Sequence, residues 1–147
     1  MKLQLLLSVL ASLALPMSAN AGDIFSDDVG VSLPSEFIKY KATKTGGKIT
    51  LAAWIIYHLD SGDLKAKADA TLKFYLSADS ILDESELLLT KSVKNIKAYR
   101  PIPKAVKAKF NLTEADKGKS IYATIESPQD QYMDNNVVYT QILADSF

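Results

Sequence analysis

The sequence predicts an all-β protein, built as an antiparallel sandwich or barrel of about seven short strands. Several segments alternate apolar and polar residues, which is the two-residue period of a half-buried strand. Clusters of Gly, Pro, Asp and Ser separate these segments at spacings of roughly 8–12 residues, as they do in sandwiches and barrels. The helical candidate Thr113–Lys117 is too short to form a structural layer.

The first half of the chain contains the segment with the strongest strand character, Lys48–His58. Its apolar residues occupy both alternating sets of positions, which predicts that both of its faces are covered. A shorter strand over Val29–Leu33 precedes it, and Glu36–Tyr40 is an ambiguous segment that would pair at a sheet edge. Gly46 and Gly47 indicate the turn that leads into the long strand.

Two later segments alternate cleanly and predict half-buried strands, Ala68–Ser77 and Val106–Leu112. Between them, Leu87–Val93 reads as a strand that follows an acidic loop. After them, Lys117–Lys119 with Gly118 at its centre predicts a tight hairpin turn.

The final strands are expected over Ile121–Glu126 and Asn136–Leu143. Pro128 ends the first of these, because proline cannot donate to a strand ladder. The chain carries neither a βαβ pattern nor an internal repeat, and its length of 147 residues corresponds to one domain.

The first 21 residues have the pattern of a secretory signal peptide. Lys2 gives a positive start, Leu3–Leu15 is an apolar stretch of 13 residues, and Ala19 and Ala21 form a small-x-small cleavage site. A membrane anchor is the alternative, but a spanning helix needs about 20 apolar residues. We therefore expect residues 1–21 to be removed and residues 22–147 to form a single domain in the periplasm or outside the cell, not spanning a membrane and not lipid-anchored.

Composition excludes several classes of chemistry. The chain has no Cys and one His, so disulfides, thiol nucleophiles and two-His metal motifs are ruled out. Basic and acidic residues number 17 each, which gives a formal net charge of +0 and argues against a nucleic-acid partner.

One stretch of sequence resembles a known family. Phe74–Asp79 reads FYLSAD, and Ile81–Asp83 and Glu86–Leu88 follow it with an acid before paired leucines. Near the end, Ile121–Glu126 precedes the paired asparagines of Asp134–Asn136. These segments, in this order, resemble the cell-adhesion-related domain found in bacteria (CARDB), over roughly residues 29–143.

The resemblance implies an immunoglobulin-like β-sandwich with about seven strands. It also implies a non-catalytic module at the cell envelope or exterior, which acts by surface recognition of a protein or a glycan. We therefore expect a binding or adhesion module and not an enzyme. The mechanism would use end loops or an exposed sheet edge, to which an extended partner adds a strand.

The acidic loop is a candidate calcium site. Asp79, Asp83 and Glu86 lie within eight residues and provide oxygen ligands of the kind that calcium prefers. Asp130 and Asp134 would add further oxygens if their loop met this one. The alternative is a solvated loop whose side chains cap local backbone amides. No other cofactor is expected.

A lysine-rich segment is the candidate site for an anionic partner. Residues 91–109 carry seven positive charges and no acid: Lys91, Lys94, Lys97, Arg100, Lys104, Lys107 and Lys109. Such a segment would dock an envelope structural or assembly factor on anionic glycan. The alternative is an edge strand on which lysines block edge-to-edge pairing.

The remaining residues are expected to be structural. His58 ends an apolar strand, and neighbours in a turn such as Asp60 and Ser61 rarely face it as a catalytic triad requires. Trp54 and Tyr57 are expected in the core, whereas Tyr132 lies among polar residues and is the better candidate for an exposed aromatic contact.

Overall fold

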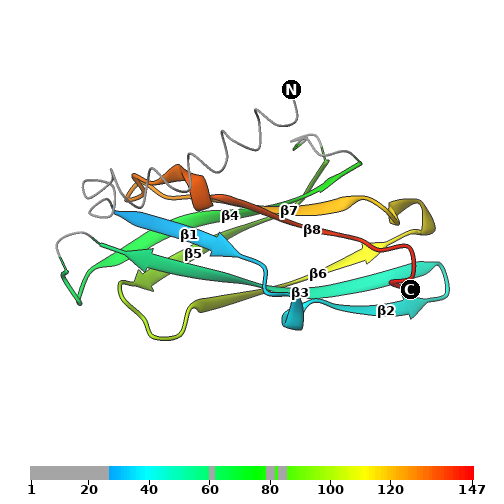
Figure 1. The fold of residues 1–147 in the computed structure, drawn as a ribbon, viewed down its shortest axis with the longest axis horizontal. Helices are drawn as coiled ribbons and strands as arrows, with labels where there is room; N and C mark the ends of the chain where they lie inside the picture. The colour runs from blue at the N-terminus through cyan, green and yellow to red at the C-terminus, as the bar shows by residue number, and fades with distance from the viewer. Residues whose placement is uncertain (1–26, 60–61, 79–81, 83–85) are drawn as a thin grey trace, which may run out of the picture.

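The computed structural model describes residues 27–59, 62–78, 82 and 86–147, which form a sandwich of two antiparallel sheets (Figure 1). The expected signal peptide and the acids Asp79 and Asp83 lie outside the described residues. In chain order the strands are β1 (Asp28–Ser32), β2 (Lys39–Thr43), β3 (Gly46–His58), β4 (Lys67–Ser77), β5 (Leu87–Lys97), β6 (Lys104–Leu112), β7 (Ser120–Glu126) and β8 (Val137–Gln141). Short 3-10 turns precede β2, β7 and β8, namely η2 (Ser35–Phe37), η4 (Glu114–Asp116) and η5 (Met133–Asn135).

Sheet A is organised around the long strand β3. On one edge, β1 pairs with the end of β3 (Ser32 opposite Trp54) and β2 pairs with its start (Lys39 opposite Thr50). On the other edge, β6 pairs with β3 from Gly47 to Ile55. The ambiguous segment around residues 36–40 therefore divides into the turn η2 and the start of an edge strand.

Sheet B has the strand order β5-β4-β7-β8. The chain changes sheets between β3 and β4, between β5 and β6, and between β6 and β7, as it does in immunoglobulin-like sandwiches. The predicted antiparallel sandwich is confirmed, with eight strands in place of about seven.

The predicted hairpin turn over Lys117–Lys119 is wrong. The strands on either side of it, β6 and β7, belong to different sheets, so the chain crosses the sandwich here. Gly118 has a φ of +87° and its N–H donates to the Ile142 carbonyl at 2.7 Å, which ties the crossover to the end of the chain. The alternation of apolar and polar residues locates a strand but does not identify the strand with which it pairs.

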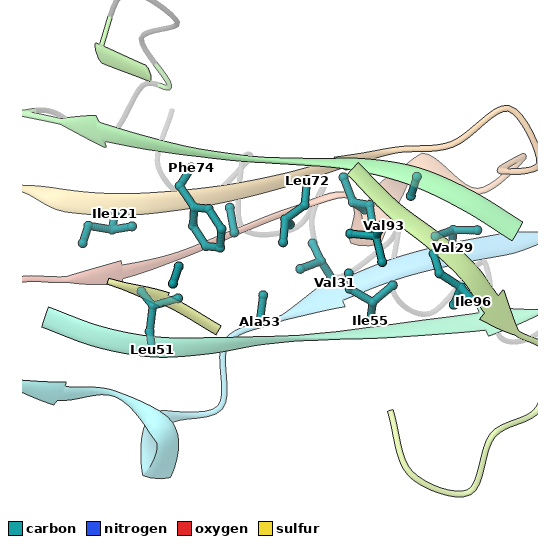
Figure 2. Packing of buried hydrophobic residues seen from close by; sticks show 14 of the residues in the cluster. Val29, Val31, Leu51, Ala53, Ile55, Leu72, Phe74, Val93, Ile96 and Ile121 are labelled. Carbon is teal, nitrogen blue, oxygen red and sulfur yellow. The ribbon is translucent and has the colours of Figure 1, made fainter. Parts of the chain in front are cut away.

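The core fills the space between the sheets (Figure 2). Side chains from β1 and β3 point up toward those from β4, β5 and β7, and Phe74 of β4 meets Phe110 of β6 with ring centroids 5.4 Å apart. The fully buried side chains include Ile49, Leu51 and Ile55 of β3.

The two faces of β3 are not covered equally, contrary to the prediction from its apolar residues. Ile49, Leu51, Ala53, Ile55 and Tyr57 point inward and are buried. The alternate positions point away from the core, and there Ile56 is 45% exposed. Within the described residues, η2 packs on this part of the outer face through Phe37, and Trp54 stays partly accessible.

No helix in the described part of the chain is long and apolar enough to cross a membrane.

Candidate functional site

The structure divides the lysine-rich segment among three environments. Lys91, Lys94 and Lys97 lie on β5, an edge of sheet B, while Lys104, Lys107 and Lys109 lie on β6, an edge of sheet A; Arg100 lies in the connection between them. Side chains alternate along a strand, so Lys91 and Lys104 face inward whereas Lys107 and Lys109 face outward.

Lys91 and Lys104 lie where β5, an edge of sheet B, faces β6, an edge of sheet A. We call this junction the seam. Both occupy inward-facing positions, Lys91 opposite Leu72 and Lys104 opposite Ile55. The Lys91 ammonium donates to the Lys107 carbonyl at 2.5 Å, and the Lys104 ammonium donates to the Lys94 carbonyl at 2.7 Å. Charges placed this way satisfy edge carbonyls and discourage pairing with another chain.

Lys94 belongs to a local structural contact at a β-bulge. Its ammonium lies 3.4 Å from Asp69, which also accepts a hydrogen bond from the Asn95 N–H at 2.9 Å. The Asn95 hydrogen bond is the main cause that holds the pKa of Asp69 below its usual range, and Lys94 and Lys104 add to it. Asn95 has a φ of +56°, a conformation that asparagine tolerates better than most residues.

Lys107 and Lys109 point outward from sheet A and join three lysines that the sequence analysis did not single out. We call this surface the basic face, and its outward lysines are Lys39, Lys41, Lys48, Lys107 and Lys109. Register builds the face, because Lys39 and Lys109 lie on either side of Thr50, and Lys41 lies directly opposite Lys48. In the described residues, none of the five forms an ion pair.

Charge on the basic face is mainly positive, with Glu36 of η2 as the acid that precedes Lys39 in the sequence. The outward positions of β2, β3 and β6 hold no acidic residue. Like charges directly opposite one another, as at Lys41 and Lys48, are destabilising. A sheet face that keeps such a pair accumulates positive potential, which an anion would relieve.

An aromatic pair lies at one side of the basic face. Trp54 and Phe37 have ring centroids 5.2 Å apart, and Phe37 is 41% exposed. The expectation that Trp54 belongs to the core is wrong, because it occupies an outward position of β3; Tyr57 is buried as expected. Aromatic surface beside cations is a combination that suits sugar rings bearing negative charge.

The acidic loop is described only in part. Glu86 is present, and its Oε2 is buried without a hydrogen-bond partner among the described residues. No group of three or more His, Cys, Asp or Glu gathers as a metal site within residues 27–59, 62–78, 82 and 86–147. The calcium site at Asp79, Asp83 and Glu86 therefore stays a prediction.

Asp130 has a structural role in the loop before β8. It accepts hydrogen bonds from the Val29 N–H at 3.2 Å, from the Tyr132 N–H at 3.1 Å and from the Asn136 amide at 2.5 Å. These contacts fasten the loop along β1. Tyr132 is half-buried there and not an open aromatic surface.

Asp28 lies beside this loop. Both of its carboxylate oxygens accept hydrogen bonds from the Asn135 amide, at 2.9 and 3.0 Å. Burial is the main reason that the pKa of Asp28 is raised, and the nearby Asp130 carboxylate raises it further. Asp28 therefore ties β1 to the turn η5 through Asn135.

His58 contacts an aromatic ring. Its ring meets Tyr99 edge-on with centroids 5.0 Å apart. The neighbours considered for a triad, Asp60 and Ser61, lie outside the described residues.

No protein-family model matches the chain. No curated protein matches it either.

The sequence pointed to Lys107 and Lys109 but not to Lys39, Lys41 and Lys48. The signal for the missed lysines was present in the alternation of residues 39–43, which read KYKAT. Recognising it required knowing that this segment pairs with β3, since the basic face exists only after β2, β3 and β6 lie side by side.

Proposed function

We propose that the protein is a non-catalytic binding module of the bacterial envelope or exterior, and that it recognises an anionic glycan with the basic face. The observation that carries this proposal is the presence of five outward lysines and a partly exposed aromatic pair on one sheet face. The signal-like residues 1–21 and the resemblance to the CARDB family support an exported recognition module.

The mechanism would be many weak contacts along an extended partner. A single exposed ion pair contributes roughly 0–1 kcal/mol, so one lysine cannot hold a ligand. Five lysines on a rigid sheet meet a repeating anion without first ordering a loop. The aromatic pair of Trp54 and Phe37 would add contact with the apolar face of a sugar ring.

Binding to a sulfated polysaccharide tests this proposal. Dextran sulfate serves as the probe and neutral dextran as its uncharged counterpart. We expect binding to dextran sulfate only, with a steep loss between low and high salt. The variant Lys48→Gln/Lys107→Gln/Lys109→Gln should bind at least tenfold more weakly, because it removes three of the five charges.

The matched control is Lys65→Gln/Lys67→Gln, which removes two exposed lysines that lie outside the basic face. It should bind dextran sulfate within about threefold of the wild-type protein. Equal loss in both variants would mean that overall charge, and not the basic face, determines binding, and the proposal would fail.

A second candidate function is strand addition at β8. This strand ends sheet B, carries no charged side chain, and presents Val137 at 48% and Tyr139 at 64% exposure. An extended peptide pairing with β8 would bind through backbone hydrogen bonds, with little dependence on salt. Salt-insensitive binding that Tyr139→Pro abolishes would favour this candidate over the basic face.

A further inference from the structure

A small pocket lies where β3 extends beyond its partner β6. The last residue pair between these strands is Ile55 with Lys104, so residues 56–58 continue without β6 and are paired with β1 only. The connection from β5 to β6 turns back against them, and the Tyr99 N–H donates to the Tyr57 carbonyl at 3.0 Å. The pocket between residues 55–58 of β3 and the connection from β5 to β6 has a volume of about 180 Å³.

The walls of this pocket are cationic and apolar together. They include Ile56, His58, Lys97, Tyr99, Arg100 and Pro103. Arg100 offers a planar fork of N–H donors that matches a carboxylate. The pocket is smaller than the 300–1,000 Å³ typical of sites for drug-sized ligands, so it suits one small unit.

Tyr99 is held in a conformation that tyrosine rarely adopts. Its φ is +53°, in the left-handed region. Its hydroxyl accepts a hydrogen bond from the Gly62 N–H at 3.1 Å, and its ring meets His58 edge-on. Backbone strain of this kind clusters at functional sites, where the surrounding structure maintains it.

The charge around the pocket is not balanced. Lys97 lies directly opposite Lys67 in the β4–β5 ladder, and no ion pair of the described residues involves either one. Unlike-charged partners would stabilise that position, whereas two lysines repel each other.

Among the described residues, no carboxylate lines the pocket. Asp28 lies opposite His58, but both of its oxygens accept from Asn135. Asp63 accepts the Lys65 N–H at 2.9 Å. Asp27 and Asp63 lie close enough to the Tyr57 hydroxyl to add to the rise in the pKa of Tyr57, which burial chiefly causes.

The pocket lies at the end of the outward row of β3. That row begins at Lys48 in the basic face, passes Trp54 and Ile56, and ends at His58. At about 3.3 Å per residue, the row from Lys48 to His58 is about 33 Å long. A polymer lying along β3 would cross the lysines, then the aromatic pair, and would reach the pocket last.

We propose that this pocket binds one hexuronate unit of an acidic glycan, with its carboxylate on Arg100 and Lys97 and its ring against Tyr99 and Pro103. This inference rests on the proposed function and deepens it. It adds a sugar-specific subsite at the end of the outward row of β3, whose start belongs to the basic face that recognises charge.

The experiment is an NMR titration of the exported protein with D-glucuronate, and with D-galactose as the neutral sugar. We expect glucuronate to shift the ring signals of His58 and Tyr99, and galactose at the same concentration to leave them unchanged. Arg100→Gln should weaken glucuronate binding at least tenfold. Lys44→Gln, an exposed turn lysine at the opposite end of β3, is the matched control and should bind normally.

The two proposals fail separately. The pocket is not a uronate site if glucuronate leaves the His58 and Tyr99 signals unchanged, or if Arg100→Gln binds glucuronate as well as Lys44→Gln does. This conclusion holds regardless of the result with dextran sulfate. If the substitutions at Lys48, Lys107 and Lys109 leave the affinity for dextran sulfate unchanged while glucuronate still binds in the pocket, the proposed function fails and the uronate subsite is retained. The inference would also be overturned if inorganic sulfate shifted the same signals as strongly as glucuronate does. The pocket would then bind anions in general and would not recognise a sugar.

Discussion

Two adjacent glycines at the start of β3 are required for different reasons. Gly46 has a φ of +150°, and a Cβ there would run into the backbone carbonyl of Leu112 in β6. A Cβ at Gly47 would instead meet the ring of Phe147, which packs over it beside Tyr40. The Lys117 ammonium lies 4.8 Å from the centroid of the same ring. The end of the chain is thus held against the sheet by a residue without a side chain.

We expect Gly47→Ala to lower the free energy of unfolding by about 1–2 kcal/mol, because Phe147 must move and its packing is lost. Gly46→Ala should cost more, since the obstacle there is backbone. Urea denaturation measures both. In a Phe147→Ala background the cost of Gly47→Ala should nearly vanish; an unchanged cost would show that the ring is not what the new methyl group meets.

The carboxylate of Asp116 organises the crossover from β6 to β7. It accepts hydrogen bonds from the Thr113 N–H at 2.7 Å, from the Thr113 hydroxyl at 3.0 Å and from the Lys119 ammonium at 3.0 Å. Burial alone would raise the pKa of Asp116, but these donors outweigh it and hold the pKa below its usual value of 3.8.

Asp116→Asn should therefore cost about 1–2 kcal/mol at pH 7. The carboxylate's contribution is complete above the usual pKa of 3.8 and is lost as the pH falls through the lower pKa of the folded state. The stability gap between wild type and variant should consequently close in acid, which thermal unfolding from pH 7 to pH 2.5 measures. Glu114→Gln, in the same turn but exposed, should change stability by less than about 0.5 kcal/mol at any of these pH values.

At the scale of the elements, the seam between β5 and β6 is the main device that protects the sandwich edges. Lys91 and Lys104 each reach across it to a carbonyl of the facing strand. On the other side, the loop before β8 lies along β1, where Asp130 and Gln131 bond to backbone groups. These contacts use backbone hydrogen-bonding groups at or beside β1, β5 and β6 that would otherwise be available to another chain.

Lys91→Met/Lys104→Met keeps the aliphatic stems and removes the two ammonium groups. We expect it to lose about 1 kcal/mol of stability and to self-associate, because edge carbonyls are then free to pair with a second molecule. Sedimentation velocity at two concentrations detects the association. Lys107→Met/Lys109→Met should stay monomeric under the same conditions; association of both variants would attribute the effect to lost charge alone.

Strand positions were predictable from the sequence, whereas strand partners were not. Alternation located β4 and β6 because one face of each is more buried than the other, and that pattern is local; β7 alternates in sequence too, although both of its faces are buried. The position of Trp54 on the outer face of sheet A was missed because β3 is apolar at both sets of positions, so its pattern does not identify the inward side. The sequence identified part of the basic face, because Lys107 and Lys109 are close in the sequence to other lysines. Lys39, Lys41 and Lys48 come beside them only when β2 and β6 pair with β3.

At the scale of the whole molecule, charge is balanced in number but not in place. The formal net charge is +0, yet the outward positions of β2, β3 and β6 carry lysines and no acid. A surface of this kind attracts anions at short range even though the distant field of the molecule is weak.

The protein should accordingly be retained by a sulfonated cation exchanger at pH 7, although its net charge gives no reason for retention. Lys48→Gln/Lys107→Gln/Lys109→Gln should elute at markedly lower salt. The control variant Lys65→Gln/Lys67→Gln loses nearly as much charge and should elute close to the wild-type protein. Elution that follows net charge alone, with both variants shifted in proportion, would contradict an oriented basic face.

The direction of the first and last strands has a mechanical consequence. β1 begins at one end of the long axis of the sandwich, and the chain ends near the other (Figure 1). A pulling force between these ends would slide β1 along β3 and β8 along β7, parallel to the strands. Five residue pairs join β1 to β3 and five join β8 to β7, and such shear loads all of them together instead of opening them one at a time. Tension along the length of the sandwich would therefore load its first and last strands in shear, which is the arrangement that resists their separation.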